Sequence, residues 1–222
     1  MMIRNNESVV INHKKIARIK REYRILTRIR RKNPYKSFPT ADIGRIPNLL
    51  KREFITPIPD EVYSTDMTYL YYGEGKKAYL SATKDLATNE IVSYRLMRVP
   101  AVSQFTEEFE TLLKSLSPEK RSHLRIHSDQ GFQYTHTAFR ELLTKYGVIQ
   151  SMSRRGNCLD NAPIESFFGH FKDLLDLKKC ETYNDVEKEI NWAMSFYNNE
   201  RPQVALNKKP PALYRGLMNC FF

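Results

Sequence analysis

The sequence predicts an α/β fold in which a five-stranded mixed sheet is flanked by helices and preceded by a basic helical arm. A change of pattern along the chain predicts this fold. Apolar residues recur at helical spacing in residues 13–32, whereas residues 62–97 contain short β-branched and aromatic runs separated by turn residues. Between them, residues 33–60 hold five prolines and are typical of an irregular linker. We therefore divide the chain into an arm with its linker, residues 1–54, and a core domain, residues 55–222.

The positive charge of the chain lies in the arm. The formal net charge is +11, and residues 1–53 contain 15 Lys and Arg against 4 Asp and Glu. The remainder of the chain contains 21 of each kind and is neutral. A basic block of this density indicates a polyanionic partner. Nucleic acid is favoured over an acidic membrane surface, because phosphate neutralisation supplies most non-specific affinity.

Cysteine usage and hydropathy indicate a cytoplasmic protein, and in a bacterium the cytoplasm is where the nucleoid DNA lies. Cys158, Cys180 and Cys220 are widely spaced and form no CxxC pair, which favours reduced thiols over disulfides or a zinc site. No run approaches the roughly 18 apolar residues that a membrane span requires. The first eleven residues also lack the apolar segment of a secretory signal. We expect no membrane partner.

The arm is expected to form an amphipathic helix over residues 13–32. Ile16, Ile19 and Tyr23 recur at helical spacing, which predicts one buried face, and Asn12 is suited to the N-cap position. The basic residues of the helix are expected to contact DNA phosphates; a solvated face without a fixed partner is the alternative. The candidate DNA-binding residues of the arm are Lys14, Lys15, Arg18, Arg21, Arg28, Arg30 and Arg31.

The core domain is expected to begin with three meandering antiparallel strands, followed by alternating helices and strands. The expected strands are 62–72, 78–84, 90–97, 124–127 and 148–152. Phe105, Phe109 and Leu112 mark a helix at 102–116. A second helix is expected to have Thr135 as its cap and Gly147 as its stop.

Two more helices follow the polar loop 153–157. The first begins near Pro163, because proline is tolerated in a helix's first turn, and it presents Glu165 and Lys172 on one side. The last begins at Thr182 with Asp185 three residues later, a capping-box pattern, and ends before Pro202. Arg154 and Arg155 in the preceding loop are expected to grip DNA, or else to solvate a mobile loop.

Three carboxylates stand where this order of elements can bring them together. Asp66 lies within the first strand, Asp129 follows the fourth, and Glu165 lies in the first turns of a later helix, thirty-five residues after Asp129. If the first and fourth strands are neighbours, as in a ribonuclease-H-like sheet, all three meet. Such oxygen donors suit Mg²⁺ or Mn²⁺, and a pair of ions about 3.5–4 Å apart can activate and cleave a phosphodiester.

Each acid also has a purely structural alternative. Asp129 could be a turn residue, Glu165 could interact with a helix dipole, and Asp66 could be an edge-strand polar residue. Asp66 fits its alternative least well. It lies in an apolar run with Tyr63, Met67 and other large side chains, where a buried carboxylate without partners would cost several kcal/mol.

Four motifs, in order, extend these observations to a family: STDMTYL, HSDQGFQYTH, QSMSRRGNCLDNAPIESFFGHFK and YNNERPQ. Over residues 9–216 the chain resembles the OrfB-type transposases of bacterial insertion sequences, which are related to retroviral integrases and use an Asp-Asp-Glu triad. The resemblance implies a ribonuclease-H-like integrase catalytic core. It also implies catalytic, metal-binding roles for Asp66, Asp129 and Glu165, a pair of Mg²⁺ or Mn²⁺ ions, and a DNA contact at Lys172.

The chain departs from the family pattern at three places. Tyr63-Ser64-Thr65-Asp66 stands where the group commonly has Trp-x-Thr-Asp. Only His13 is present where retroviral relatives carry a His/His/Cys/Cys module, so no zinc is expected. The family's helix-turn-helix is expected to be cut short by Met1, which implies an upstream-frame DNA-binding partner or fusion.

The resemblance implies cleavage at the element's terminal inverted repeats and strand transfer to target DNA by a homo-oligomer. Two alternatives remain open at this point. A ribonuclease-H-like endonuclease would only cut, and a non-catalytic remnant would bind DNA as a regulator.

Overall fold

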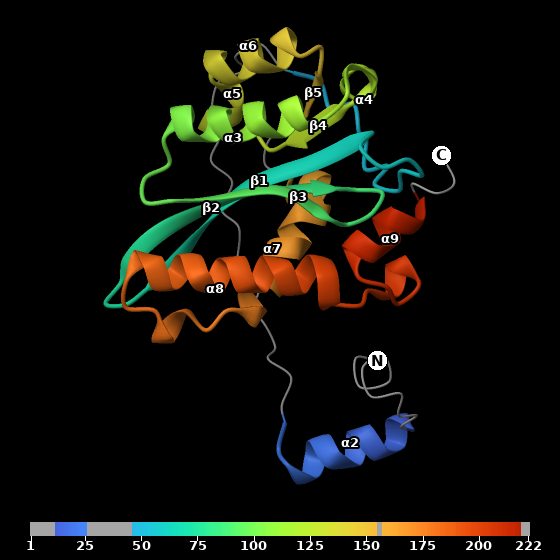
Figure 1. Ribbon diagram of the computed structural model, residues 1–222, viewed down its shortest axis with the longest axis vertical. Coiled ribbons are helices and arrows are strands. Elements are labelled where there is room, and N and C mark those ends of the chain that lie inside the picture. The colour runs from blue at the N-terminus through green and yellow to red at the C-terminus, as the bar shows by residue number, and fades with distance from the viewer. Residues whose placement is uncertain (1–11, 26–45, 155–156, 219–222) are drawn as a thin grey trace. The chain divides into compact units, whose positions relative to one another are not determined.

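The computed structural model describes residues 12–25, 46–154 and 157–218. The chain divides into two compact units, residues 1–41 and residues 42–222 (Figure 1). The expected boundary near residue 55 stays a prediction, although Leu50 packs with Val62 and Leu86 inside the second unit. No helix in the described ranges is both long and apolar enough to cross a membrane.

The first unit contains helix α2, His13–Glu22. Asn12 caps it as expected, since its side chain accepts a hydrogen bond of 2.9 Å from the amide of Lys14. The helix ends earlier than expected, because Tyr23 leaves the helical conformation and Arg24 has a positive φ of 49°. The expected buried face is also wrong for the described part of the arm, since no residue of α2 is buried.

The second unit is built on one five-stranded mixed sheet with the order β3-β2-β1-β4-β5. The first three strands are antiparallel neighbours, and β4 runs parallel to both β1 and β5. The expected adjacency of the first and fourth strands is therefore confirmed. The strands are β1 Val62–Tyr72, β2 Lys76–Asp85, β3 Ile91–Met97, β4 Arg125–Ser128 and β5 Ile149–Met152.

Helices cover both faces of this sheet (Figure 1). Four of them match expected helices: α3 Val102–Ser115, α6 Thr137–Lys145, α7 Ala162–Leu174 and α8 Tyr183–Ser195. The short helices α4 Pro118–His123 and α5 Phe132–Thr135, and the C-terminal helix α9 Pro211–Met218, were not expected. The expected cap Thr135 is wrong, because it belongs to α5 and the side chain of His136 caps α6 instead. The capping box of Thr182 and Asp185 is confirmed at the start of α8.

Alternation along β1 separates two apolar layers. Leu70 points to the face covered by α7 and α8, where it packs with Phe171 and Ile190. Tyr63 points to the other face and packs with Phe105 of α3 and residues of α6. Since successive side chains of a strand point to opposite faces, residues 64, 66 and 68 share the face of α7. This parity places Asp66 on the side of the sheet from which Glu165 comes.

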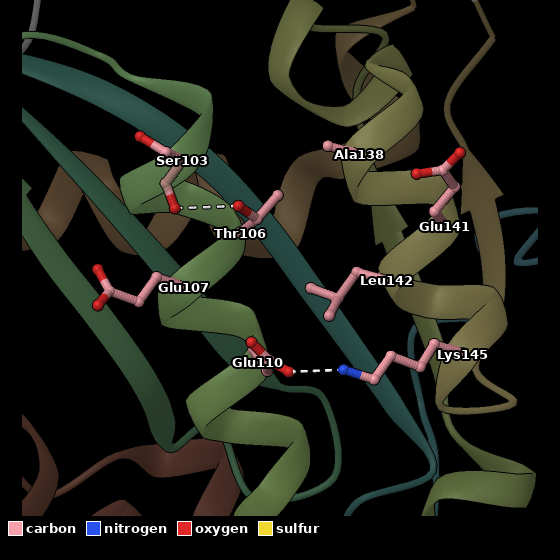
Figure 2. A pocket seen from close by; sticks show the side chains of 8 residues that line it. All are labelled: Ser103, Thr106, Glu107, Glu110, Ala138, Glu141, Leu142 and Lys145. Carbon is pink, nitrogen blue, oxygen red and sulfur yellow. Dashed lines mark hydrogen bonds and ion pairs between the residues drawn. The ribbon is translucent and has the colours of Figure 1, made fainter.

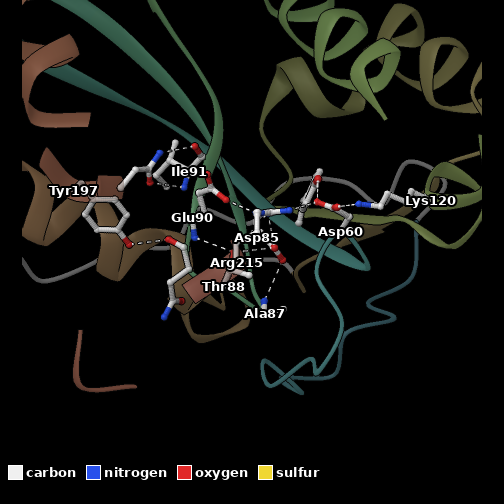
Figure 3. Close-up of polar contacts among 12 residues, drawn as sticks. Asp60, Asp85, Ala87, Thr88, Glu90, Ile91, Lys120, Tyr197 and Arg215 are labelled. Atoms are coloured by element: carbon white, nitrogen blue, oxygen red, sulfur yellow. Dashed lines mark hydrogen bonds and ion pairs between the residues drawn. The ribbon is translucent and has the colours of Figure 1, made fainter. Parts of the chain in front are cut away.

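A cluster of charged residues fastens α9 to the sheet (Figure 3). The guanidinium of Arg215 donates to Asp60 at 2.7 Å, to Asp85 at 2.6 Å and to Glu90. Asp60 also accepts hydrogen bonds from Lys120 at 2.7 Å and from the hydroxyl of Tyr63 at 2.6 Å. Tyr63 therefore joins the apolar layer to this ionic cluster with its one polar atom.

Candidate active site

Asp66 and Asp129 occupy equivalent levels on neighbouring parallel strands. The pairing of β1 with β4 places Ser64 opposite His127, and each Asp lies two residues further along its own chain. Because side chains repeat their direction every second residue, both carboxylates are directed to the face that carries α7. β4 ends at Ser128, so Asp129 stands at its carboxyl end.

Glu165 lies in the first turn of α7, on the same face of the sheet, and its side chain is exposed. The electrostatic interactions of the acids show that they are near one another. The pKa of Asp66 is raised to about 7, chiefly by burial and then by the negative charges of Asp129 and Glu165, whereas the amide of Met67 and the ammonium of Lys172 oppose the shift. Burial also raises the pKa of Glu165, again with a contribution from Asp129.

Both aspartates are oriented by backbone amides. Oδ1 of Asp66 accepts a hydrogen bond of 2.7 Å from Met67, and Oδ1 of Asp129 accepts one of 2.8 Å from Gly131. Burial also raises the pKa of Asp129. A Cβ atom at Gly131 would lie 2.9 Å from Oδ1 of Asp129 and 2.8 Å from Nε2 of Gln133. A side chain at residue 131 would therefore displace the ends of the Asp129 and Gln133 side chains from these positions.

The donor set fits a hard divalent cation. Carboxylate oxygens are the preferred ligands of Mg²⁺ and Mn²⁺, and a cation would relieve both the burial and the mutual repulsion of these acids. As they stand, no three His, Cys, Asp or Glu side chains of the described ranges are gathered closely enough to hold a metal ion. If such a site forms, Glu165, as the exposed member, is the acid whose side chain would have to complete it.

Hydrogen bonds join the start of α7 to both strands that carry the aspartates. Oδ1 of the buried Asn161 accepts from Ser64 at 2.7 Å, and its Nδ2 donates to the carbonyl of Thr65 at 3.2 Å. Nε2 of the buried His127 lies 2.9 Å from the carbonyl oxygen of Asp160. The helix that carries Glu165 is thus attached at the residues two positions before Asp66 and Asp129.

Sequence reasoning did not identify Asn161 or Gly131 as functional residues. The Asp160-Asn161 pair directly before Ala162, where α7 begins, was the available signal, since polar residues that become buried require hydrogen-bond partners. His127 is a buried strand histidine whose ring nitrogens lie within hydrogen-bond distance of Ser151 and of the carbonyl of Asp160. Lys84 adds one more attachment, since its buried ammonium donates to the carbonyl of Pro163 at 3.3 Å.

Asp160 is the anchor of the loop before α7. It is buried and accepts hydrogen bonds from Arg154, at 2.8 and 3.0 Å, and from Arg52, at 2.7 Å. Arg154 is the main reason why the pKa of this carboxyl lies well below its usual range. Arg154 therefore does more than solvate its loop, because its guanidinium is held by an ion pair. Even so, 61% of its side chain stays exposed.

The other expected DNA contacts fall into three groups. Lys172 of α7 donates to Oγ1 of Thr68 at 2.6 Å, which places it beside β1 just beyond Asp66. Four of the candidate DNA-binding residues of the arm lie in its described part, and all four are exposed on α2: Lys14, Lys15, Arg18 and Arg21. Those that lie outside the described residues are Arg28, Arg30, Arg31 and Arg155.

A separate hollow lies between α3 and α6 (Figure 2). Glu110 and Lys145 form an ion pair of 2.9 Å across it. It is lined by Ser103, Thr106, Glu107, Glu110, Ala138, Glu141, Leu142 and Lys145. None of the three acids lines this hollow, and the candidate active site is therefore distinct from it.

Comparison with known proteins identifies the family. Two family models described as "Integrase core domain" match residues 56–158 and 146–211. The chain is 38% identical to an uncharacterized transposase-like protein of Haemophilus influenzae, over 97% of this chain and 98% of that protein. It is 34% identical to the putative transposase InsK of insertion sequence element IS150 from Escherichia coli K12, over 96% of this chain and 74% of that protein. The chain is an insertion-sequence transposase of the integrase superfamily.

Solved structures agree with this transposase in fold. The catalytic core domain of HTLV-2 integrase, solved in complex with magnesium, superposes with a TM-score of 0.56 over 71% of this chain and 97% of that domain, at 19% identity. The expected integrase catalytic core, with its ribonuclease-H-like five-stranded mixed sheet, is therefore confirmed.

Proposed function

We propose that this transposase cleaves DNA at the ends of its insertion sequence and joins them to target DNA, with Asp66, Asp129 and Glu165 as the ligands of two Mg²⁺ or Mn²⁺ ions. The observation that carries the proposal is the equal level of the two aspartates on adjacent parallel strands, with the charge of Glu165 acting on Asp66. The names of the relatives, which refer to insertion sequences, support DNA ends and target DNA as the substrates.

The residues of the site have different tasks in this proposal. Bound divalent ions would activate the attacking water or 3′-hydroxyl and stabilise the leaving oxygen. Asp66 and Asp129, fixed by backbone amides, are the oriented ligands. Glu165 completes the set from α7. Lys172, beside Asp66, neutralises a phosphate of the reacting strand.

The remainder of the chain would bind DNA and partner subunits. The exposed basic residues of α2 support a role for the arm in holding DNA phosphates. Two element ends must be processed together, so we propose that the transposase works as a homo-oligomer on DNA. An upstream-frame DNA-binding segment, as a partner or as a fusion, would supply recognition of the terminal repeats.

The first test is Asp129→Asn, which keeps the shape of the side chain and removes its charge. We expect loss of both Mg²⁺-dependent nicking and joined products, because one ligand of the ions is lost, while circular dichroism and salt-dependent DNA binding stay as in the wild type. Glu187→Gln, which removes an exposed charge on α8, is the matched control and should keep full activity. Full strand transfer by Asp129→Asn would contradict the ligand assignment.

The same assay separates the alternatives. A nuclease that only cuts would yield nicked donor ends without joined products. A regulatory remnant would bind DNA and yield neither product at any Mg²⁺ or Mn²⁺ concentration.

A further inference from the structure

We propose that Lys77 and Lys172, gathered around the ring of Tyr69, form a binding site for the phosphodiester backbone of the DNA strand that leaves the active site along β1. This inference rests on the proposed function, and Lys77 is the residue that it adds. The two lysines come from different elements, β2 and α7, and meet at one aromatic side chain of β1.

The geometry of the site is defined by one ring and two ammonium groups. Nζ of Lys77 and Nζ of Lys172 each lie 5.4 Å from the ring centroid of Tyr69. Lys77 is also 5.4 Å from the ring of Tyr71, which contacts Tyr69 edge-on. Both tyrosines are more than half exposed, so this cluster lies on the surface. Cation–π contacts at exposed sites are worth about 0.5–1 kcal/mol each, which is enough to orient the lysines.

The cluster brings two positive charges to one ring, and the negative charge of Asp66 acts on one of them, that of Lys172. Two like charges held at one ring repel each other, and none of the ion pairs found in the described ranges joins Lys77 or Lys172 to a carboxylate. Because the lysines already approach the ring of Tyr69, the cluster presents ammonium groups rather than an open ring to a ligand. An anion at either ammonium would offset its positive charge, which favours a phosphate over a stacked base.

The position of the cluster connects it to the site of chemistry. Tyr69 follows Asp66 by three residues in an extended strand, or about 10 Å along β1. Lys172 contacts both Thr68 and Tyr69, whose side chains point to opposite faces of the strand, so its ammonium lies at the strand's edge. Beyond Ser64, β4 no longer pairs with β1, since this pairing covers only Val62 to Ser64. A DNA strand with a rise of about 3.4 Å per nucleotide would reach the cluster roughly three nucleotides from the reacting phosphate.

The test compares two adjacent lysines of β2. Lys76 carries the same charge as Lys77 and is equally exposed, but it points to the other face and donates to the carbonyl of Glu181 at 3.2 Å. Lys77→Ala and Lys76→Ala are made in the Asp129→Asn protein, so that the DNA stays intact. Binding of a short fluorescein-labelled duplex is measured by anisotropy over a series of salt concentrations.

We expect Lys77→Ala to weaken binding and to reduce the slope of log K against log [salt] by about 0.9, the value for one phosphate contact. Lys76→Ala should leave the slope unchanged. Tyr69→Leu should reproduce part of the Lys77→Ala effect, because the lysines lose the ring that orients them, whereas Tyr69→Phe should not. Equal slopes for the two lysine variants would overturn the proposal.

The outcome is independent of the metal-ligand assignment. Binding is measured without chemistry, so a failure of Asp66, Asp129 and Glu165 as catalytic ligands would leave the difference between Lys77→Ala and Lys76→Ala in place. If the two lysine variants give equal slopes while the protein with an intact Asp129 cleaves and joins DNA, only the proposed phosphate site is ruled out.

Discussion

Asn161 should be required for activity beyond its contribution to stability. Asn161→Ala would leave the hydroxyl of Ser64 and the carbonyl of Thr65 without their partner in a buried environment. Each unsatisfied group costs about 1–3 kcal/mol, so we expect the free energy of unfolding to fall by roughly 2–6 kcal/mol. The same two bonds hold the start of α7 to β1, and a displacement of Glu165 by about 1 Å would lower strand transfer on the order of 100-fold.

Urea unfolding measures the stability of this variant, and Mg²⁺-dependent strand transfer by protein that is still folded measures its activity. The Mg²⁺ concentration for half-maximal activity should also rise, because a displaced Glu165 binds the ions less well. Ser64→Ala is the matched control: it leaves Oδ1 of Asn161 without its donor, keeps the bond from Asn161 to Thr65, and should cost about 1–3 kcal/mol. Wild-type activity and metal dependence in a destabilised Asn161→Ala protein would refute the positioning role and leave only a structural one.

Two further predictions concern stability. Burial raises the pKa of Glu108 to about 7 from the usual 4.5. Between these two pH values the folded state keeps a proton that the unfolded state releases. The free energy of unfolding should therefore fall as pH rises from 4.5 to about 7, by about 3 kcal/mol in total. Glu108→Gln should abolish this fall and be more stable than the wild type in urea at pH 8, and parallel pH profiles of the two proteins would contradict the reasoning. Arg215→Ala leaves Asp60, Asp85 and Glu90 without their shared guanidinium and should lower the free energy of unfolding by roughly 3–5 kcal/mol. Arg215→Lys should recover only part of this loss, because one ammonium cannot match a planar fork, and full recovery in urea unfolding would argue against the three-way contact.

The parts of the fold that could be predicted are those with local signals. The strand β1 was expected at 62–72 and lies at Val62–Tyr72, because alternating side chains identify a strand from its own residues. The capping box at Thr182 is equally local. The helix α9 gave no such signal, since it is held through Arg215 by residues more than a hundred positions earlier in the chain. The start of α6 was misplaced because threonine is a commoner cap than histidine, whereas His136 is the residue whose side chain reaches the amide of Ala138.

The candidate site divides in the same way. Asp66, Asp129 and Glu165 were recognisable from their residue types and their places in the order of elements. Asn161 and Gly131 act through what they touch: one bonds to a strand nearly a hundred residues away, and the other leaves room for a carboxylate. Such roles depend on packing, and no pattern in the neighbouring sequence predicts them.

The shared level of Asp66 and Asp129 also determines where the protein tolerates insertions and deletions. Ser64 and His127 pair across the two strands, and each acid follows its paired residue by two positions. The positions of the two carboxylates therefore do not depend on the length of the chain that connects the strands. Turns could be added to α3, or residues inserted between α3 and β4, without moving either carboxylate. One residue deleted between Ser64 and Asp66 would instead turn the acid toward the opposite, apolar layer, because each step along a strand reverses the side chain.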